Sequence, residues 1–244
     1  MDSDCILPES YFDEVEAELE TAPADAFGGP DCAHDSFTDI QKAINYSMTS
    51  FFTTGGIRGG KKKMDKFYPR SFNMGVRREV YQALGGFSKM RFGEDIDFSI
   101  RIFKGGYKCR LFPGAWVYHK RRTDLKKFFK QVHNSGIARI NLYKKYPESL
   151  KLVHLLPAAF TLGVALLLVG GLFCPYSLLP ILFYALLVCV DSACCNHSLR
   201  IGVYSIAASF IQLIGYGTGF WRAWWQRCIL KRGEFEAFQK NFYK

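Results

Sequence analysis

The pattern of apolar residues separates a mixed first part of the chain from an almost uniformly apolar last part. Residues 152–190 include no Asp, Glu, Lys or Arg, and a second uncharged run covers 201–221. A helix of about 20 apolar residues crosses the ~30 Å hydrocarbon core of a bilayer. We therefore expect membrane spans near 152–173, 176–193 and 201–221, with a tight turn at Cys174-Pro175-Tyr176. A buried soluble helix is the alternative for any one of them.

Before Leu152, shorter periodic segments predict a mixed α/β region. Apolar residues spaced three and four apart indicate helices, and apolar runs bounded by glycine or proline indicate strands. Ser36 is the expected N-cap of one helix, and the basic stretch 53–63 is expected to be a flexible loop. The expected helices cover 10–20, 37–52, 76–84, 95–104 and 124–146, and the expected strands cover 24–29, 107–112 and 115–119.

The segment 124–146 is a basic amphipathic helix, with Phe128 and Val132 on its apolar face. Directly before a span, this pattern is typical of a helix lying on the cytoplasmic leaflet. An ordinary surface helix of the domain fits equally well. We divide the chain into an α/β domain (1–123), an interfacial helix (124–150), a membrane region of two to three helices (151–221) and a basic tail (222–244).

The net charge of +10 is distributed unevenly along the 244 residues. Residues 1–60 carry a net charge of −10, residues 61–151 carry +16 and the remainder carries +4. The basic middle suggests an anionic partner, either nucleotide phosphate or membrane lipid. Nucleic acid is disfavoured, because no helix-turn-helix, finger or RNP pattern accompanies the charge.

The basic segments create a conflict in membrane topology. Lysines and arginines crowd both the segment before Leu152 and the tail from Arg222 to Lys244. The positive-inside tendency places both in the cytoplasm, which three full crossings do not allow. Either one apolar segment lies in the interface or re-enters, or the tail departs from the tendency.

The eight cysteines are irregularly spaced, and half of them fall between positions 174 and 195. No pair has the spacing of a zinc finger, and disulfides or zinc binding are the less favoured alternative. We interpret them as apolar thiols in a reducing compartment.

Two acidic clusters and one histidine are the candidate chemistry of the α/β region. Asp2 and Asp4 are one residue apart, and such a pair can hold Mg²⁺ or Mn²⁺ against a diphosphate. Taken alone, the pair is as typical of a solvated turn. His119 follows an apolar strand and precedes basic residues, so it is a candidate third metal ligand, and equally an ordinary core or surface histidine.

The second acidic cluster lies at the start of the helix expected at 95–104. Glu94 and Asp95 follow Gly93, and Asp97, a candidate for substrate binding, comes two residues later. Acidic residues are routine in a first helical turn, where they stabilise the helix by ~0.3–1 kcal/mol. Their crowding also shifts their pKa values apart, which suits a general base that accepts a hydroxyl proton.

Further candidates for substrate binding flank these clusters. Arg70 and Asn73 lie in an aromatic segment (67–75) that suits a sugar or acceptor wall, and a strand running into a glycine turn explains the segment equally well. Arg121 and Arg122 follow His119 and provide cations for phosphate.

Several of these stretches resemble the family-2 inverting glycosyltransferases of GT-A fold, in particular the bacterial membrane-associated ones. The resemblance covers roughly residues 1–146 and rests on DSDC, NMGVRREVYQALGGF, FGEDIDFSIRIFKGGYKCRLFP and VYHKRR. It implies Asp2, Asp4 and His119 as ligands of Mn²⁺ or Mg²⁺ and Asp95 as the general base, with Glu94 beside it. In relatives, a Q-x-x-R-W/Y element contacts the donor or the growing product. The nearest run here is Gln131-Val132-His133-Asn134, which lacks the arginine and disfavours a processive polysaccharide synthase.

The resemblance implies a fold, a reaction and a location. The fold is the C-terminal half of an α/β GT-A domain followed by transmembrane helices. The reaction is transfer from a nucleotide sugar, expected to be a UDP-sugar, to a polyprenyl-linked or envelope glycan acceptor, with inversion. The location is the bacterial inner membrane, with the catalytic part facing the cytoplasm. Because the family's first nucleotide-binding half would precede Asp2, we expect the chain to be an N-terminally truncated fragment.

Two other hypotheses come from different classes of protein. The chain could be a non-catalytic membrane protein, either an inactive remnant or a partner subunit, which predicts no saturable site for a UDP-sugar. It could instead bind anionic lipid or nucleic acid through residues 61–151, which predicts steeply salt-dependent binding without sugar nucleotides.

Overall fold

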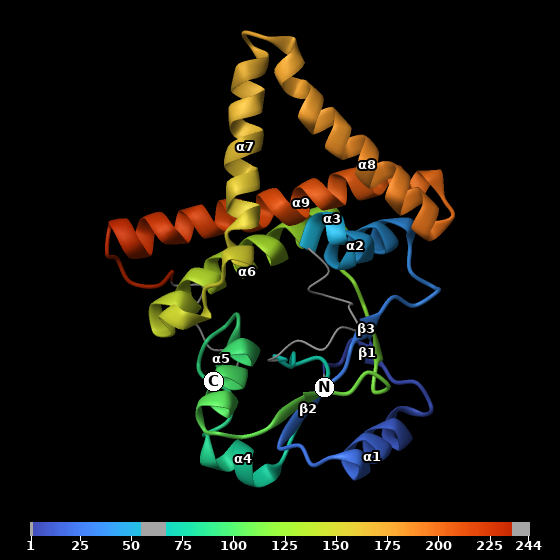
Figure 1. Cartoon of the computed structure of the whole chain (residues 1–244), viewed down its shortest axis with the longest axis vertical. Coiled ribbons are helices and arrows are strands. Elements are labelled where there is room, and N and C mark those ends of the chain that lie inside the picture. Colours follow the sequence, from blue (N-terminus) through green and yellow to red (C-terminus); the bar gives the residue numbers. More distant parts are fainter. Residues whose placement is uncertain (1, 55–66, 236–244) are drawn as a thin grey trace. The chain divides into compact units, whose positions relative to one another are not determined.

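The computed structural model describes residues 2–54 and 67–235, and these residues form two compact units (Figure 1). The sheet unit comprises 2–35 and 67–120, with Phe235. The helical unit comprises 36–54 and 121–234. The expected mixed α/β region followed by apolar helices is confirmed. Residues 36–54, which the sequence pattern groups with the α/β domain, belong to the helical unit.

The sheet unit contains two small three-stranded sheets. In one, β6 (Val117–His119) lies between β1 (Cys5–Ile6), which is antiparallel to it, and β3 (Asp31–Cys32), which is parallel. In the other, β2 (Ala26–Gly28) lies between antiparallel β4 (Met74–Val76) and parallel β5 (Cys109–Leu111). Strands were predicted around β2, β5 and β6, and 67–75 had a strand as its alternative; β1 and β3 were not predicted.

Three helices complete the sheet unit: α1 (Tyr11–Thr21), α4 (Arg78–Ala83) and α5 (Glu94–Lys104). Each lies within two residues of its predicted bounds at both ends. Apolar side chains of the described part of the unit pack in clusters. Phe98 and Ile102 of α5 pack with Val80 of α4 and Ala26 of β2. Another cluster contains Tyr11, Ala24, Phe112, Ala115 and Val117.

The helical unit begins with α2 (Asp39–Thr49) and α3 (Phe51–Thr54). The predicted N-cap at Ser36 is wrong. The cap is Thr38, whose hydroxyl accepts from the Gln41 backbone while the Gln41 side chain accepts from the Thr38 backbone. This reciprocal pair satisfies two helix-end donors at once. Thr53 and Thr54 are helical, and the remainder of the predicted loop at 53–63 lies outside the described residues.

The rest of the helical unit consists of α6 (Leu125–Lys145), α7 (Leu156–Gly171), α8 (Leu179–Asn196) and α9 (Leu199–Trp224). A π-helical turn at Trp225–Ile229 extends α9, so the first part of the predicted basic tail is helical. A 3-10 turn at Pro175–Leu178 joins α7 to α8 at the turn that the sequence predicts. Among the residues that the structure describes, three segments are long and apolar enough to cross a membrane: Leu152–Gly171, Pro175–Asn196 and Leu199–Ile229.

Candidate active site

The pairing of β1 with β6 brings Asp4 beside His119. Cys5 lies opposite His119 in the antiparallel register, and the Lys120 backbone donates to the Asp4 carbonyl over 3.1 Å. The His119 Nε2 atom is then 3.5 Å from Asp4 Oδ1. Because the two residues are 115 positions apart, this contact depends on the strand register and not on local sequence.

The other side of the His119 ring faces Asp31, which the sequence reasoning missed. β3 runs parallel to β6, and Asp31 Oδ2 lies 3.6 Å from His119 Nδ1. That distance is too long for a hydrogen bond, and the buried Nδ1 atom has no hydrogen-bond partner among the described residues. The Phe72 ring stacks on the imidazole at 4.5 Å between centroids. His119 is thus held by packing, with a carboxylate close to each ring nitrogen.

This arrangement suits a divalent cation. One ligand atom each from Asp4, Cys5 and His119 lie within 4.8 Å of one another. Burial, together with the Asp4 and Asp2 carboxylates, raises the pKa of the Cys5 thiol to about 11. The thiol is therefore neutral at physiological pH and a poor ligand. The carboxylate oxygens around His119 are the donors that Mg²⁺ and Mn²⁺ prefer.

The turn at residues 70–73 connects the two acidic clusters. Ser71 Oγ donates to Asp2 Oδ2 over 3.4 Å, and the adjacent Arg70 donates through Nη1 to Asp95 Oδ2 over 3.3 Å. Neighbouring residues of one turn thus contact an acidic residue from the start of the chain and one from near position 95. The structure brings together the two clusters that the sequence singled out.

The first turn of α5 positions Glu94 and Asp95. It follows Gly93, whose φ of 82° lies in the left-handed region that side chains disfavour. Asp95 is mostly buried, and its Oδ1 accepts from the Ile96 backbone over 2.7 Å. Burial raises the pKa of Glu94, and the nearby Asp95 and Asp2 raise it further, against a backbone hydrogen bond and Arg70, which lower it. Glu94 Oε2 is buried without a hydrogen-bond partner among the described residues.

Two of the candidate substrate-binding residues are buried in the interior of the sheet unit. Asn73 is fully buried, where its amide accepts from the Tyr11 hydroxyl over 2.7 Å and donates to the Ala115 carbonyl over 2.8 Å. Asp97 is also fully buried and pairs with Arg101 at 3.0 Å. Both side chains are therefore engaged in contacts within the fold, and their role in substrate binding stays a prediction.

The two arginines after His119 belong to the helical unit. Arg121 is 4% exposed, and its guanidinium donates to Asn45 Oδ1 of α2 over 2.8 and 3.0 Å. Arg122 is exposed and donates to the Gln131 side chain over 3.2 Å. Their predicted role in phosphate binding stays a prediction.

Comparison with known proteins gives two findings. A family model described as "Glycosyl transferase family group 2" matches residues 1–191, well over half of the chain. The chain is also similar to "Probable glycosyltransferase YdaM" of Bacillus subtilis (strain 168), with 30% identity over 59 residues. That alignment covers 24% of this chain and 14% of the relative, so the match spans a small part of the relative's length.

Proposed function

The chain belongs to glycosyl transferase family group 2, and on that premise we propose that its sheet unit carries out an inverting transfer from a nucleotide sugar. The observation that carries the proposal is the turn at 70–73, where Ser71 contacts Asp2 and Arg70 contacts Asp95. A divalent cation for the diphosphate and a base for the acceptor are both needed near one anomeric carbon. The hydrogen bonds of Asp2 and Asp95 with adjacent residues of this turn support that arrangement.

Asp95 is the proposed general base. Its carboxylate withdraws the proton from the acceptor hydroxyl as that oxygen attacks the anomeric carbon. The bond from this carbon to the diphosphate oxygen breaks on the opposite face, so the configuration inverts. The guanidinium of Arg70 at 3.3 Å fixes the direction of the carboxylate. Glu94, buried with a raised pKa, keeps a second carboxyl group beside the base.

Asp2, Asp4 and His119 are the proposed ligands of Mn²⁺ or Mg²⁺, with Asp31 as a further candidate. The buried Nδ1 of His119 accepts or donates no hydrogen bond among the described residues, and together with the surrounding carboxylates it fits such an ion. When bound, the cation neutralises the negative charge that builds up on the departing diphosphate. Phe72 and the strand pairing hold the histidine ring in place for this role.

The proposed donor is a UDP-sugar and the proposed acceptor a polyprenyl-linked or cell-envelope glycan. The apolar helices support an acceptor that is embedded in or close to a membrane. We place the protein in the bacterial inner membrane with the sheet unit facing the cytoplasm, where nucleotide sugars are made. The basic residues around 120–151 support this orientation through the positive-inside tendency.

The test compares two Asp→Asn variants of the sheet unit. With a panel of UDP-sugars, Mn²⁺ and membrane-extracted acceptors, Asp95→Asn should reduce UDP release by about 10²–10⁴-fold, the usual contribution of a positioned base. Asp25→Asn is the matched control, because Asp25 also pairs with an arginine, Arg77, at 3.9 Å. Asp25 precedes the first residue of β2, whereas the turn at 70–73 adjoins the last residue of β2. Near-normal turnover by Asp95→Asn refutes the base assignment.

Metal dependence is tested separately, by binding. Titrating UDP with Mn²⁺ against the purified chain should give a saturable signal that His119→Ala weakens and that a chelator abolishes. A chain without any saturable UDP site supports the alternative of a non-catalytic membrane protein.

A further inference from the structure

We propose that α7 and α8 cross the bilayer as a helical hairpin, whereas α9 lies along the membrane interface on the side from which the hairpin enters. Two crossings then replace the three that apolar length alone predicts. The ligand of this surface is the lipid bilayer itself. The inference concerns the helical unit and is independent of the proposed reaction.

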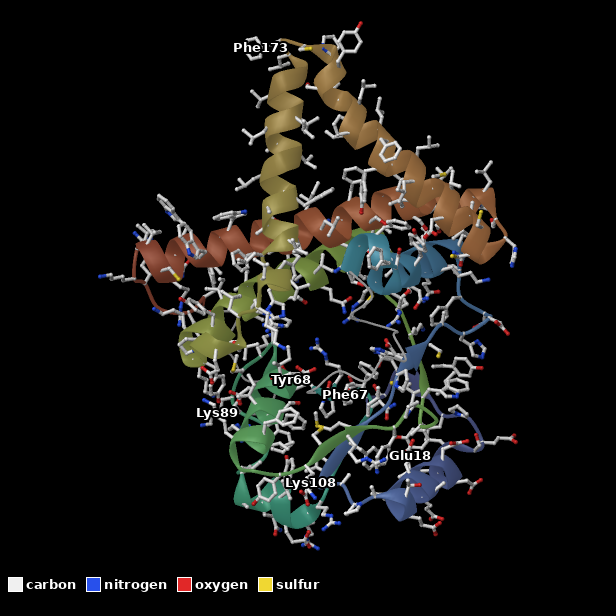
Figure 2. The ribbon with its side chains drawn as sticks, in the orientation of Figure 1. Glu18, Phe67, Tyr68, Lys89, Lys108 and Phe173 are labelled. Carbon is white, nitrogen blue, oxygen red and sulfur yellow. The ribbon has the colours of Figure 1, made fainter. Side chains whose placement is uncertain are left out.

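The side chains of α7 and α8 have few protein partners. Leu166 is 72% exposed and Phe183 is 69% exposed, and Phe173 projects from the connection between the helices, as Figure 2 shows. The two apolar segments have 20 and 22 residues, which corresponds to ~30 and ~33 Å at 1.5 Å per residue. That is the thickness of the hydrocarbon core. An exposed apolar surface of this extent marks a contact with protein or with a membrane, and its length matches the membrane.

The third apolar helix, α9, is covered by protein. In its most apolar window 39% of the residues are buried, against 6% and 11% for the segments containing α7 and α8. Its first half packs on α2, where Ile44 and Met48 contact Ile201 and Ala208, and Arg200 pairs with Asp39 at 3.2 Å. From its first turn onward, α9 is therefore covered by α2.

The second half of α9 packs on the basic helix α6. The His133 ring lies 3.1 Å from the Thr218 hydroxyl, and Val132 lies against Gly215. The exposed side of α6 carries lysines at 126, 127, 130, 144 and 145. If α9 crossed the bilayer, α2 and α6 would have to accompany it into the hydrocarbon. Each charge placed there costs about 2.5–3.5 kcal/mol. The lysines alone thus oppose a crossing strongly.

The hairpin and α6 lie on opposite faces of α9. A side chain at Gly217 would collide with Thr161 of α7, and one at Gly219 would collide with the His133 carbonyl of α6. Two residues correspond to about 200° around a helix. In Figure 1, α7 stands on α9 while α6 runs along the other side of α9. One face of α9 thus points to the hairpin and lipid, and the other to polar helices.

Both ends of the hairpin rest on α9. The Trp221 indole donates to the Ala158 carbonyl of α7 over 3.0 Å, and the hydroxyls of Ser192 in α8 and Ser205 are 2.6 Å apart. An even number of crossings returns the chain to its starting side before α9 begins. The basic residues before Leu152 and those after Trp221 then share one side, which removes the conflict with the positive-inside tendency.

Three native cysteines report the topology. Cys174 lies at the tip of the hairpin, Cys194 near the end of α8 and Cys228 in the turn after α9. Sealed membrane vesicles of known orientation are treated with a membrane-impermeant maleimide, and the labelled peptides are identified by mass spectrometry. We expect Cys194 and Cys228 to be labelled from one side and Cys174 only from the other.

Three outcomes overturn the proposal. Labelling of Cys228 together with Cys174 means three crossings. Labelling of all three from one side means that the hairpin does not cross. Failure of Cys174 to react in sealed vesicles of either orientation places the tip inside the bilayer. Detergent-solubilised vesicles, in which all three thiols should react, provide the control, and single-cysteine variants of the full chain assign each signal.

Discussion

The sheet unit and the helical unit differ in which side chains they bury and which they expose. In the sheet unit, fully buried Asn73 and Asp97 each have polar partners. In the helical unit, α7 and α8 expose leucines and phenylalanines over most of their length. The contrast is consistent with water around the sheet unit and lipid around α7 and α8. Water demands that buried polar groups be paired, whereas lipid tolerates exposed apolar surface and excludes charge.

The largest effect is expected from breaking a buried pair in the sheet unit. Arg101→Met removes the guanidinium that lies 3.0 Å from the Asp97 carboxylate, which is 0% exposed. It also removes the donors that hold the Leu84 and Gly86 carbonyls at 2.6 Å. An uncompensated buried charge costs about 3–5 kcal/mol, so chemical denaturation should show a corresponding loss of stability.

The double variant Asp97→Leu with Arg101→Met is the control for that loss. Replacing both partners with apolar residues removes the stranded charge. Most of the stability should return, and a double variant as unstable as the single one would show that the carbonyl contacts dominate.

The converse experiment introduces a charge into the helical unit. Leu166→Arg places a guanidinium in the middle of α7, where Leu166 is 72% exposed. In water this change would be nearly neutral, but in lipid it costs about 2.5–3.5 kcal/mol. The fraction of protein that resists alkaline extraction from membranes should fall several-fold. Leu166→Ile should behave as the original chain does, and equal extraction of both variants would place α7 outside the lipid.

A smaller effect is expected at the start of α2. Thr38→Ala removes the hydroxyl that accepts from the Gln41 backbone over 3.3 Å. Loss of such a cap costs about 0.5–2 kcal/mol. Thermal unfolding of the detergent-solubilised chain should show the change, and Thr38→Ser should preserve the midpoint. Equal midpoints for Ala and Ser would mean that packing against α9 alone holds this helix.

The smallest effect concerns Glu94 and depends on pH. Burial raises its pKa above the ordinary 4.5, so the folded state binds a proton more readily than the unfolded state. Stability from this group is therefore lost as pH rises from about 4.5 through the raised pKa. Glu94→Gln should raise the unfolding midpoint slightly at pH 7.5 and leave it unchanged near pH 4. A variant that is less stable at pH 7.5 would contradict the burial of a charged carboxylate.

The sequence predicted elements whose periodicity extends over several turns. The helices α1, α5 and α6 and the first two apolar segments lie close to their expected bounds, whereas the third segment continues to Ile229, beyond its expected end at 221. The strands β1 and β3 have two residues each, too few for an alternating pattern. Their existence depends on pairing with β6, a contact between segments far apart in the chain.

The same limit applies to the site. Asp2, Asp95 and His119 were recognisable from their neighbours, but Asp31 contacts His119 only because β3 and β6 pair. Its position directly after Gly28-Gly29-Pro30, at the end of a predicted strand, was the available signal. Asn73 was singled out from the sequence, and its side chain is buried in the fold. A single polar residue looks the same in sequence whether it contacts a substrate or fills the core.

The close contacts of α9 limit which substitutions can stabilise this protein. Alanine in place of a helical glycine usually favours the helix by about 1 kcal/mol, so automated stabilisation schemes select such sites first. At Gly217 and Gly219 the added methyl group would push α7 or α6 outward. Glycine should therefore be kept at positions 217 and 219 when the protein is stabilised by substitution.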